Sequence, residues 1–100
     1  MIDKVLIDSV WYNVEETDEP ILVDGIQCGG KVEYNLALIQ LGKEYSARGL
    51  HILMHEVVHA LMHERGISDE HNNEEVVEAL AKGIINFIRG NKTLIEEIQK

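Results

Sequence analysis

The pattern of apolar residues changes near residue 42, and this change limits the folds open to the chain. Before it, short runs of β-branched and aromatic residues alternate with turn-forming residues, as in strands joined by tight connections. After it, apolar residues recur every three or four positions over two long stretches, as in amphipathic helices. Strands followed by helices predict an α+β fold in which two packed helices cover one face of a small sheet.

The first 42 residues are expected to form that sheet. Strand-like composition marks the segments 5–14, 21–23, 31–34 and 36–41. The acidic segment 15–20 and the Gly-containing segments 24–25 and 27–30 separate them as connections and turns. Turns of this kind join neighbouring strands, so we expect a small antiparallel sheet of three to four strands within residues 1–42.

The first helix is expected over residues 45–65. The segment contains few helix breakers, and Arg65-Gly66 ends it as a basic last turn followed by a C-cap glycine. No Pro or Gly interrupts the run from Leu50 to Met62, so the middle of this helix is regular.

The second helix is expected over residues 73–90, after a polar loop. Asn72 or Asn73 serves as its N-cap, and acidic residues follow in the first turn. Its apolar residues keep the i, i+3, i+4 spacing of a core-facing helix until Gly90 stops it. The segment 93–99 offers one last helical turn.

Composition favours a single cytoplasmic domain. One hundred residues form one domain near the size at which a bound metal adds useful stability. A net charge of −9 disfavours nucleic-acid binding. The longest apolar run is far short of the ~20 residues of a membrane span, and no signal peptide is apparent. The single Cys28 cannot form an intramolecular disulfide, and we expect it to be a half-buried thiol in a turn.

The segment His55-Glu56-Val57-Val58-His59 lies inside the first helix and has the H-E-x-x-H pattern. Imidazoles four residues apart on a helix differ by about 40° in direction and ~6 Å in height, so both can reach one metal ion. Glu56 follows the first of them and can hold a water at the open side of the ion. This is the two-histidine zinc motif of metallopeptidases, with one Zn²⁺ per chain. The alternative is a surface helix with ordinary exposed histidines.

A catalytic zinc site needs a third protein ligand. Position 65 is Arg, which excludes the third histidine of the metzincins, and the second helix offers Glu74, Glu75 and Glu78. Glu78 is favoured because it lies one turn into the helix among core-facing residues, where an unpaired charge is costly. Glu75 lies one turn earlier, and Glu74 is at the fraying end. The alternative for Glu78 is a solvated pair with Lys82.

Other histidines and tyrosines are candidates for supporting roles. His51 and His63 continue the four-residue spacing of the motif along the helix. Each points about 40° further away from the centre of the metal site, so neither is expected to bind the metal. His71, in the loop between the helices, could stabilise a developing oxyanion. Tyr34 and Tyr45 are weaker candidates for that role.

Two segments resemble the helix pair of a minimal gluzincin: His55 to Leu61, and Val77-Glu78-Ala79-Leu80-Ala81. The nearest group is the ImmA/IrrE-type metallopeptidases, with the small phage and prophage zincin-like proteins similar to them. These pair H-E-x-x-H with a glutamate followed by Ala on the next helix. The resemblance covers about residues 36–88. It implies His55, His59 and Glu78 as zinc ligands and Glu56 as general base.

The leading hypothesis is a zinc-dependent peptidase that hydrolyses a peptide bond in a protein substrate. The zinc ion would polarise a water and the scissile carbonyl, while Glu56 takes the water's proton and passes it to the leaving amine. The strand 36–41 would bind an extended substrate by edge addition, which favours a loop in a partner protein such as a regulator.

Two other hypotheses compete with the peptidase. The first is a non-catalytic zincin-like module that binds zinc or a partner protein, since the chain is small and no oxyanion donor can be assigned by motif. The second is an acidic, phage-type regulator that sequesters another protein, with the motif incidental.

Overall fold

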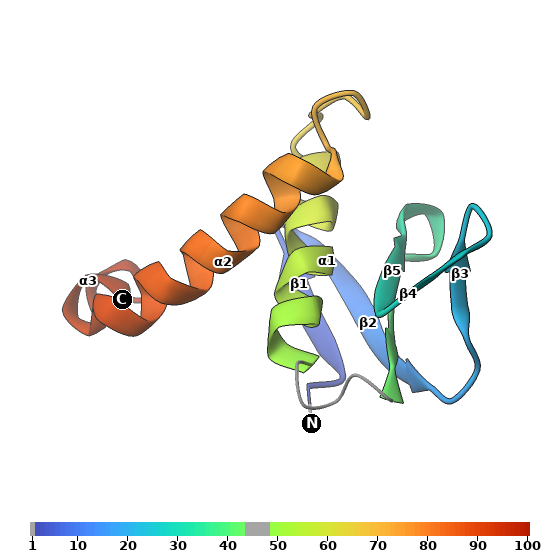
Figure 1. Ribbon diagram of the computed structural model, residues 1–100. Coiled ribbons are helices and arrows are strands. Elements are labelled where there is room, and N and C mark those ends of the chain that lie inside the picture. The colour runs from blue at the N-terminus through green and yellow to red at the C-terminus, as the bar shows by residue number, and fades with distance from the viewer. Residues whose placement is uncertain (1, 44–48) are drawn as a thin grey trace.

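A computed structural model describes residues 2–43 and 49–100 (Figure 1). The predicted α+β class is confirmed. The main sheet has four strands in the order β1 (Lys4–Ile7), β2 (Val10–Thr17), β6 (Leu38–Gly42) and β5 (Gly30–Glu33). A separate hairpin pairs β3 (Ile21–Val23) with β4 (Ile26–Cys28). A 3₁₀ turn, η1 (Tyr34–Leu36), joins β5 to β6, and the helices are α1 (Gly49–Glu64), α2 (Glu74–Gly90) and α3 (Lys92–Ile98).

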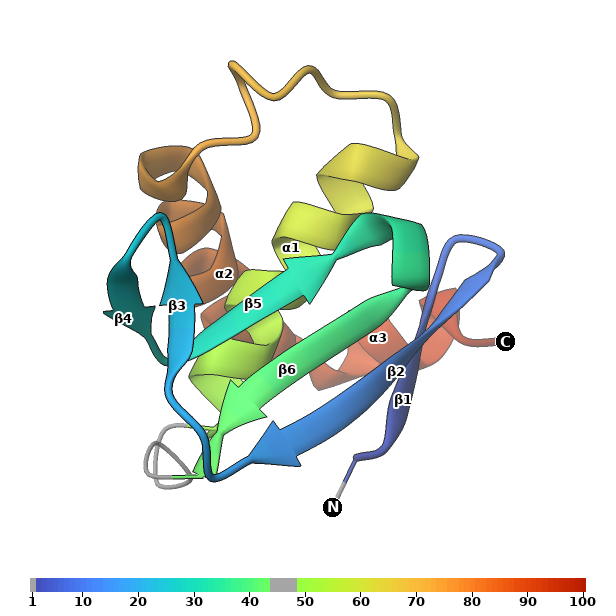
Figure 2. The same ribbon diagram turned by 90° about the vertical axis from the view of Figure 1, so that its right-hand side faces the viewer.

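The main sheet is mixed, whereas an antiparallel sheet was expected. β1 pairs antiparallel with β2, and β5 pairs antiparallel with β6. β6 and β2 are parallel, with Asn13 opposite Leu38 and Thr17 opposite Gly42. After β2 the chain passes through the β3–β4 hairpin and β5 before β6 enters between β5 and β2 (Figure 2). β6 is therefore a central strand, and the outer edge beyond it is formed by β5.

The predicted first strand, 5–14, is two strands joined by a tight turn. Asp8 in this turn has φ of 52°, the left-handed region that Asp tolerates better than most residues. β2 then continues to Thr17, so the acidic segment 15–20 is half strand and half loop. The predicted turn at Asp24-Gly25 is confirmed, with positive φ at both residues.

α1 lies between the sheet and α2. Its inner side packs on the buried face of the sheet, and the core there is made of these residues: Ile7, Tyr12, Val14, Ile39, Leu41, Leu53 and Ala60. Its other side contacts α2 through Val58, Val77 and Ala81. The outer part of α2 and all of α3 extend away from the sheet (Figure 1). Because α1 is packed on two sides, the side chains on its remaining side have fixed positions.

The helix bounds agree with the predicted ones where they can be compared. The predicted start of the first helix, residues 45–48, lies outside the described residues, and the helix ends at Glu64. Asn73, one of the two predicted caps, is the N-cap of α2, and its side chain accepts a hydrogen bond from the Val76 N–H. The predicted last turn is α3.

Replacing Tyr12 with Phe is expected to lower the free energy of unfolding by about 1–2 kcal/mol. Tyr12 is fully buried, and its hydroxyl donates a hydrogen bond of 2.7 Å to Glu64 Oε1. Phe keeps the packing but leaves the carboxylate without this partner. Urea unfolding at neutral pH measures the loss, with Glu64→Gln as a milder control that keeps an acceptor. Equal stability of Tyr12→Phe and wild type would contradict a stabilising role for this bond.

Two glycine substitutions are expected to have opposite effects on stability. A Cβ on Gly30, in β5, would lie 2.9 Å from Ile52 Cγ2 and 3.0 Å from the Gln40 carbonyl oxygen. Gly30→Ala should therefore cost about 1–3 kcal/mol. Gly83, in α2, has nothing within 4 Å of such a Cβ, and Gly83→Ala should add about 0.5–1 kcal/mol through helix propensity. Thermal unfolding tests both, and a loss at both positions would be the contradicting result.

Candidate metal centre

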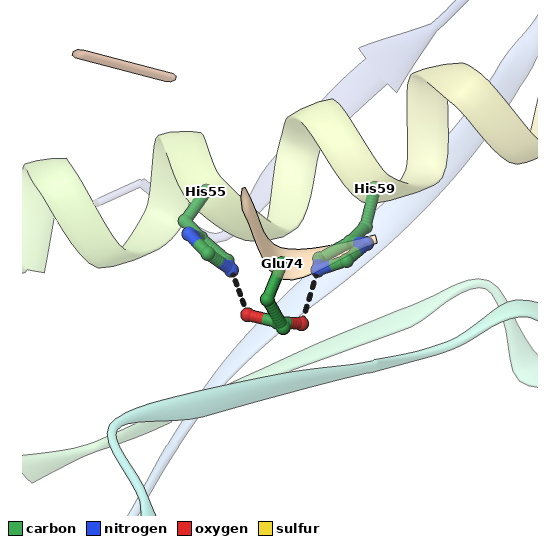
Figure 3. Close-up of side chains that lie close together, drawn as sticks. All are labelled: His55, His59 and Glu74. Atoms are coloured by element: carbon green, nitrogen blue, oxygen red, sulfur yellow. Dashed lines mark hydrogen bonds and ion pairs between the residues drawn. The ribbon is translucent and has the colours of Figure 1, made fainter. Parts of the chain in front are cut away.

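His55 and His59 leave the same side of α1 and converge on one carboxylate (Figure 3). His55 Nε2 lies 2.8 Å from Glu74 Oε2, and His59 Nε2 lies 2.8 Å from Glu74 Oε1. One ring nitrogen of each histidine and one carboxylate oxygen of Glu74 all lie within 4.8 Å of one another. The helical spacing of the motif thus places its two imidazoles as predicted, and the carboxylate between them comes from Glu74.

Glu74 reaches this position because α2 begins beside the part of α1 that carries the motif. Asn73 caps the first turn of α2, and Glu74 is the first residue of the helix. One turn later Val77 is fully buried against α1 and fixes the distance between the helices. Glu74 was among the three carboxylates considered from the sequence, but its place at the helix end counted against it. The cap asparagine was the signal that could have reversed this choice.

Glu78, the expected third ligand, lies behind His55 and not between the two histidines. Its Oε1 is 3.4 Å from His55 Nδ1 and 2.7 Å from His51 Nε2. Burial alone would raise the pKa of Glu78, but the hydrogen bonds from His55 and His51 lower it below its usual value. The structure therefore brings Glu78 to the far nitrogen of a motif histidine, one helical turn from Glu74.

The other residues considered from the sequence do not all lie near the motif. Tyr34 lines the groove beside the motif, and its ring stacks on His63 with centroids 4.0 Å apart and planes 6° from parallel. His71 is exposed and is not one of the described residues that line the groove. Glu75 is also exposed. Tyr45 lies outside the described residues.

Glu56 is the motif's central carboxylate, and it is buried with a relative exposure of 5%. Its Oε2 has no hydrogen-bond partner among the described residues. Burial raises the pKa of Glu56 to about 7; His59 acts to lower it and Glu74 to raise it. An unpaired buried carboxylate oxygen costs free energy, so Oε2 needs a donor from a water or a ligand in the groove.

A groove of about 890 Å³ runs past the motif. Its walls are α1, the start of α2, the edge strand β5 and the β3–β4 hairpin, which contributes Val23, Ile26 and the half-buried Cys28. The strand 36–41, expected to be the edge that binds a substrate, corresponds to β6 and is central in the sheet. That expectation was wrong, because β5 pairs with the outer side of β6 and takes the edge position.

The donor atoms fit a metal ion. His55 has Glu78 at Nδ1 and Glu74 at Nε2, while His59 has Asn72 at Nδ1 and Glu74 at Nε2. A neutral imidazole carries only one N–H, so it cannot donate to both of these oxygens. A cation between the two Nε2 atoms and the Glu74 carboxylate would be coordinated by the lone pairs of these atoms. Tetrahedral zinc ligands lie on the order of 3.3 Å apart, so the three donor atoms, which lie within 4.8 Å of one another, would have to adjust around the ion.

Asn72 is the residue of this centre that the sequence did not reveal. It was considered only as a helix cap, yet its side-chain oxygen lies 2.8 Å from His59 Nδ1. Polar residues are common in loops, and nothing in the spacing between positions 59 and 72 indicates this contact.

No protein-family model, curated protein or solved structure matches the chain. Across residues 2–43 and 49–100, none of the helices has the length and apolar composition needed to cross a bilayer.

Proposed function

We propose that the protein is a zinc-dependent peptidase whose ion is held by His55, His59 and Glu74. The observation that carries the proposal is the convergence of these three donors beside the buried carboxylate of Glu56. Two histidines and one carboxylate, with a position left for water, form the ligand set of many catalytic zinc sites. The resemblance to minimal gluzincins and ImmA/IrrE-type metallopeptidases supports the same reaction, with Glu74 in the place expected for Glu78.

Zinc in this position would supply a Lewis acid for the hydrolysis of an amide bond. Glu56 accepts a proton from the attacking water and then delivers it to the leaving nitrogen as the C–N bond breaks. A carboxyl whose pKa is raised to about 7 suits both steps near neutral pH. Glu78 fixes the orientation of His55 by accepting a hydrogen bond from its Nδ1.

A protein or peptide substrate suits the groove. β5 is the edge strand of the main sheet on the groove side, so an extended segment can add to it through main-chain hydrogen bonds. The apolar side chains of Val23, Ile26 and Ile52 then provide contacts for the segment's side chains. A regulator protein with an exposed loop can supply an extended segment of this kind.

Zinc titration of the chelator-stripped protein tests the centre. We expect about one zinc per chain. Loss of a residue that only hydrogen-bonds to a ligand typically weakens metal binding about 10–100-fold, and Glu74→Ala should weaken zinc binding by more than this. Glu78→Ala should fall within that range. Glu75→Ala, at the next position of α2 but not among the described residues that line the groove, is the matched control and should bind like wild type. Loss of zinc in Glu78→Ala with unchanged binding in Glu74→Ala would transfer the ligand role to Glu78.

Catalysis itself is tested with a library of unstructured peptides. Zinc-loaded protein is incubated with the library, and new termini are identified by mass spectrometry. We expect cleavage that stops when zinc is chelated and returns when zinc is restored. One bound zinc without any cleavage would reject the peptidase.

A second candidate is a zinc-binding module that recognises a partner and does not hydrolyse it. The outer part of α2 and α3 favours it, because large apolar side chains are exposed there: Phe87, Ile88, Leu94 and Ile98. In that case Glu56→Gln would leave zinc binding and partner binding unchanged.

A further inference from the structure

Asn72 uses its whole side-chain amide to connect three groups at the end of the groove. Its Nδ2 donates to the His59 carbonyl oxygen at 3.0 Å and to the Tyr34 hydroxyl oxygen at 3.2 Å. Its Oδ1 lies 2.8 Å from His59 Nδ1. An amide nitrogen has two hydrogens, and both are used here.

The orientation of this amide follows from its neighbours. The carbonyl oxygen of His59 can only accept, so the nitrogen of Asn72 and not its oxygen must face it. Oδ1 therefore faces His59 Nδ1 and must accept a hydrogen from it. The other ring nitrogen of His59, Nε2, then carries no hydrogen, and its lone pair points toward the position between His55 and Glu74.

The Tyr34 hydroxyl is also constrained by Asn72. Its oxygen accepts from Asn72, so its own proton must point elsewhere. The ring is held by its parallel stack on His63, and the side chain lines the groove with Glu56 and His59. Burial raises the pKa of Tyr34, partly opposed by the hydrogen bond from Asn72, so the hydroxyl keeps its proton at neutral pH. Tyr34 thus has a proton that it can donate to another group in the groove.

We infer that Tyr34 is a catalytic hydrogen-bond donor to the carbonyl oxygen of the scissile bond, and that Asn72 is the positioning residue that directs it there. This inference rests on the proposed peptidase function. It supplies the oxyanion donor that no motif identifies.

Tyr34 is chemically unchanged in the proposed hydrolysis step. Attack of water on the carbonyl carbon places negative charge on the carbonyl oxygen, and the Tyr34 O–H donates to that oxygen while keeping its proton. The water's proton moves to Glu56 and then to the leaving nitrogen. Donors aimed at a developing oxyanion are typically worth about 10²–10³ in turnover.

Acetohydroxamate tests Tyr34 without a peptide substrate, since its carbonyl oxygen can accept the same hydrogen bond when the probe binds zinc. Calorimetric titration of zinc-loaded Tyr34→Phe should show acetohydroxamate affinity reduced about 10-fold, with zinc affinity unchanged. Phe keeps the stack on His63 and removes only the hydroxyl. Equal hydroxamate affinity in wild type and variant would overturn the inference while leaving the zinc centre intact. A wild-type protein that binds no zinc would overturn both this inference and the proposed function.

Asn72 is tested by nitrogen-resolved NMR of the zinc-loaded protein. In wild type the His59 Nδ1 proton should appear as a slowly exchanging signal, because Asn72 accepts its hydrogen bond. Asn72→Ala should lose this signal to exchange with water and bind zinc about 10–100-fold more weakly. Asn86→Ala, an exposed position on α2 outside this groove, should keep both properties. A protected Nδ1 proton and wild-type zinc affinity in Asn72→Ala would overturn the positioning role.

Discussion

Glu56→Gln is expected to reduce peptide-bond hydrolysis by a factor of about 10²–10⁴ without releasing zinc. Gln has nearly the same size as Glu but cannot take a proton from water. The proposed zinc donors are His55, His59 and Glu74, so the substitution leaves that set unchanged. The variant should also fold, since a neutral amide is easier to bury than a carboxylate whose Oε2 has no partner among the described residues.

The measurement is a comparison of turnover for any peptide found in the library, with zinc content determined on the same samples. Glu75→Gln is the matched control, because the same chemical change is made at an exposed position on α2. Undiminished turnover in Glu56→Gln would remove Glu56 from the mechanism. Loss of zinc from this variant would instead show that Glu56 belongs to the ligand set.

Zinc is expected to stabilise the fold strongly, and His59→Ala to abolish this effect. An ion that binds only the folded chain adds about 4 kcal/mol at a thousandfold excess over its dissociation constant. For a domain of this size that is a rise of roughly 15–30 °C in the unfolding midpoint. The ion would hold α1 to the first turn of α2, in addition to the apolar packing between these helices that includes Val58 and Val77.

The quantity to measure is the shift that zinc causes within each variant, because His59 is buried and its loss also removes packing. Calorimetric scans with and without zinc give this shift directly. His71→Ala removes an exposed histidine outside the groove and should keep the full zinc effect. A zinc effect that survives in His59→Ala would place the ion elsewhere on the protein.

The sequence was most informative where the relevant contacts are local. His55 and His59 are one helical turn apart, so their convergence depends only on α1 being helical. The α+β class likewise follows from periodicities that each segment carries by itself. The Asn73 cap and the end of α2 could be located for the same reason.

The structure differs from the sequence-based expectations in relations between distant segments. Choosing between Glu74 and Glu78 requires knowing where α2 crosses α1, which is set by Val77 packing on α1 and not by spacing within α2. The central position of β6 depends on which strand it joins after β5, and strand composition does not encode that order. Asn72 was missed because its bonds to His59 and Tyr34 form only once the loop is in place.

The groups proposed to bind zinc and move the proton come from one uninterrupted stretch, His55 to Glu74, whereas most of the groove's opposite wall comes from the β3–β4 hairpin and β5. In the proposed peptidase, metal chemistry and substrate preference would therefore be carried by separate parts of the chain. A duplicated copy of this gene can acquire a new target through changes in residues 21–33 alone. Its reaction centre would be inherited intact, so divergence in specificity need not pass through inactive intermediates.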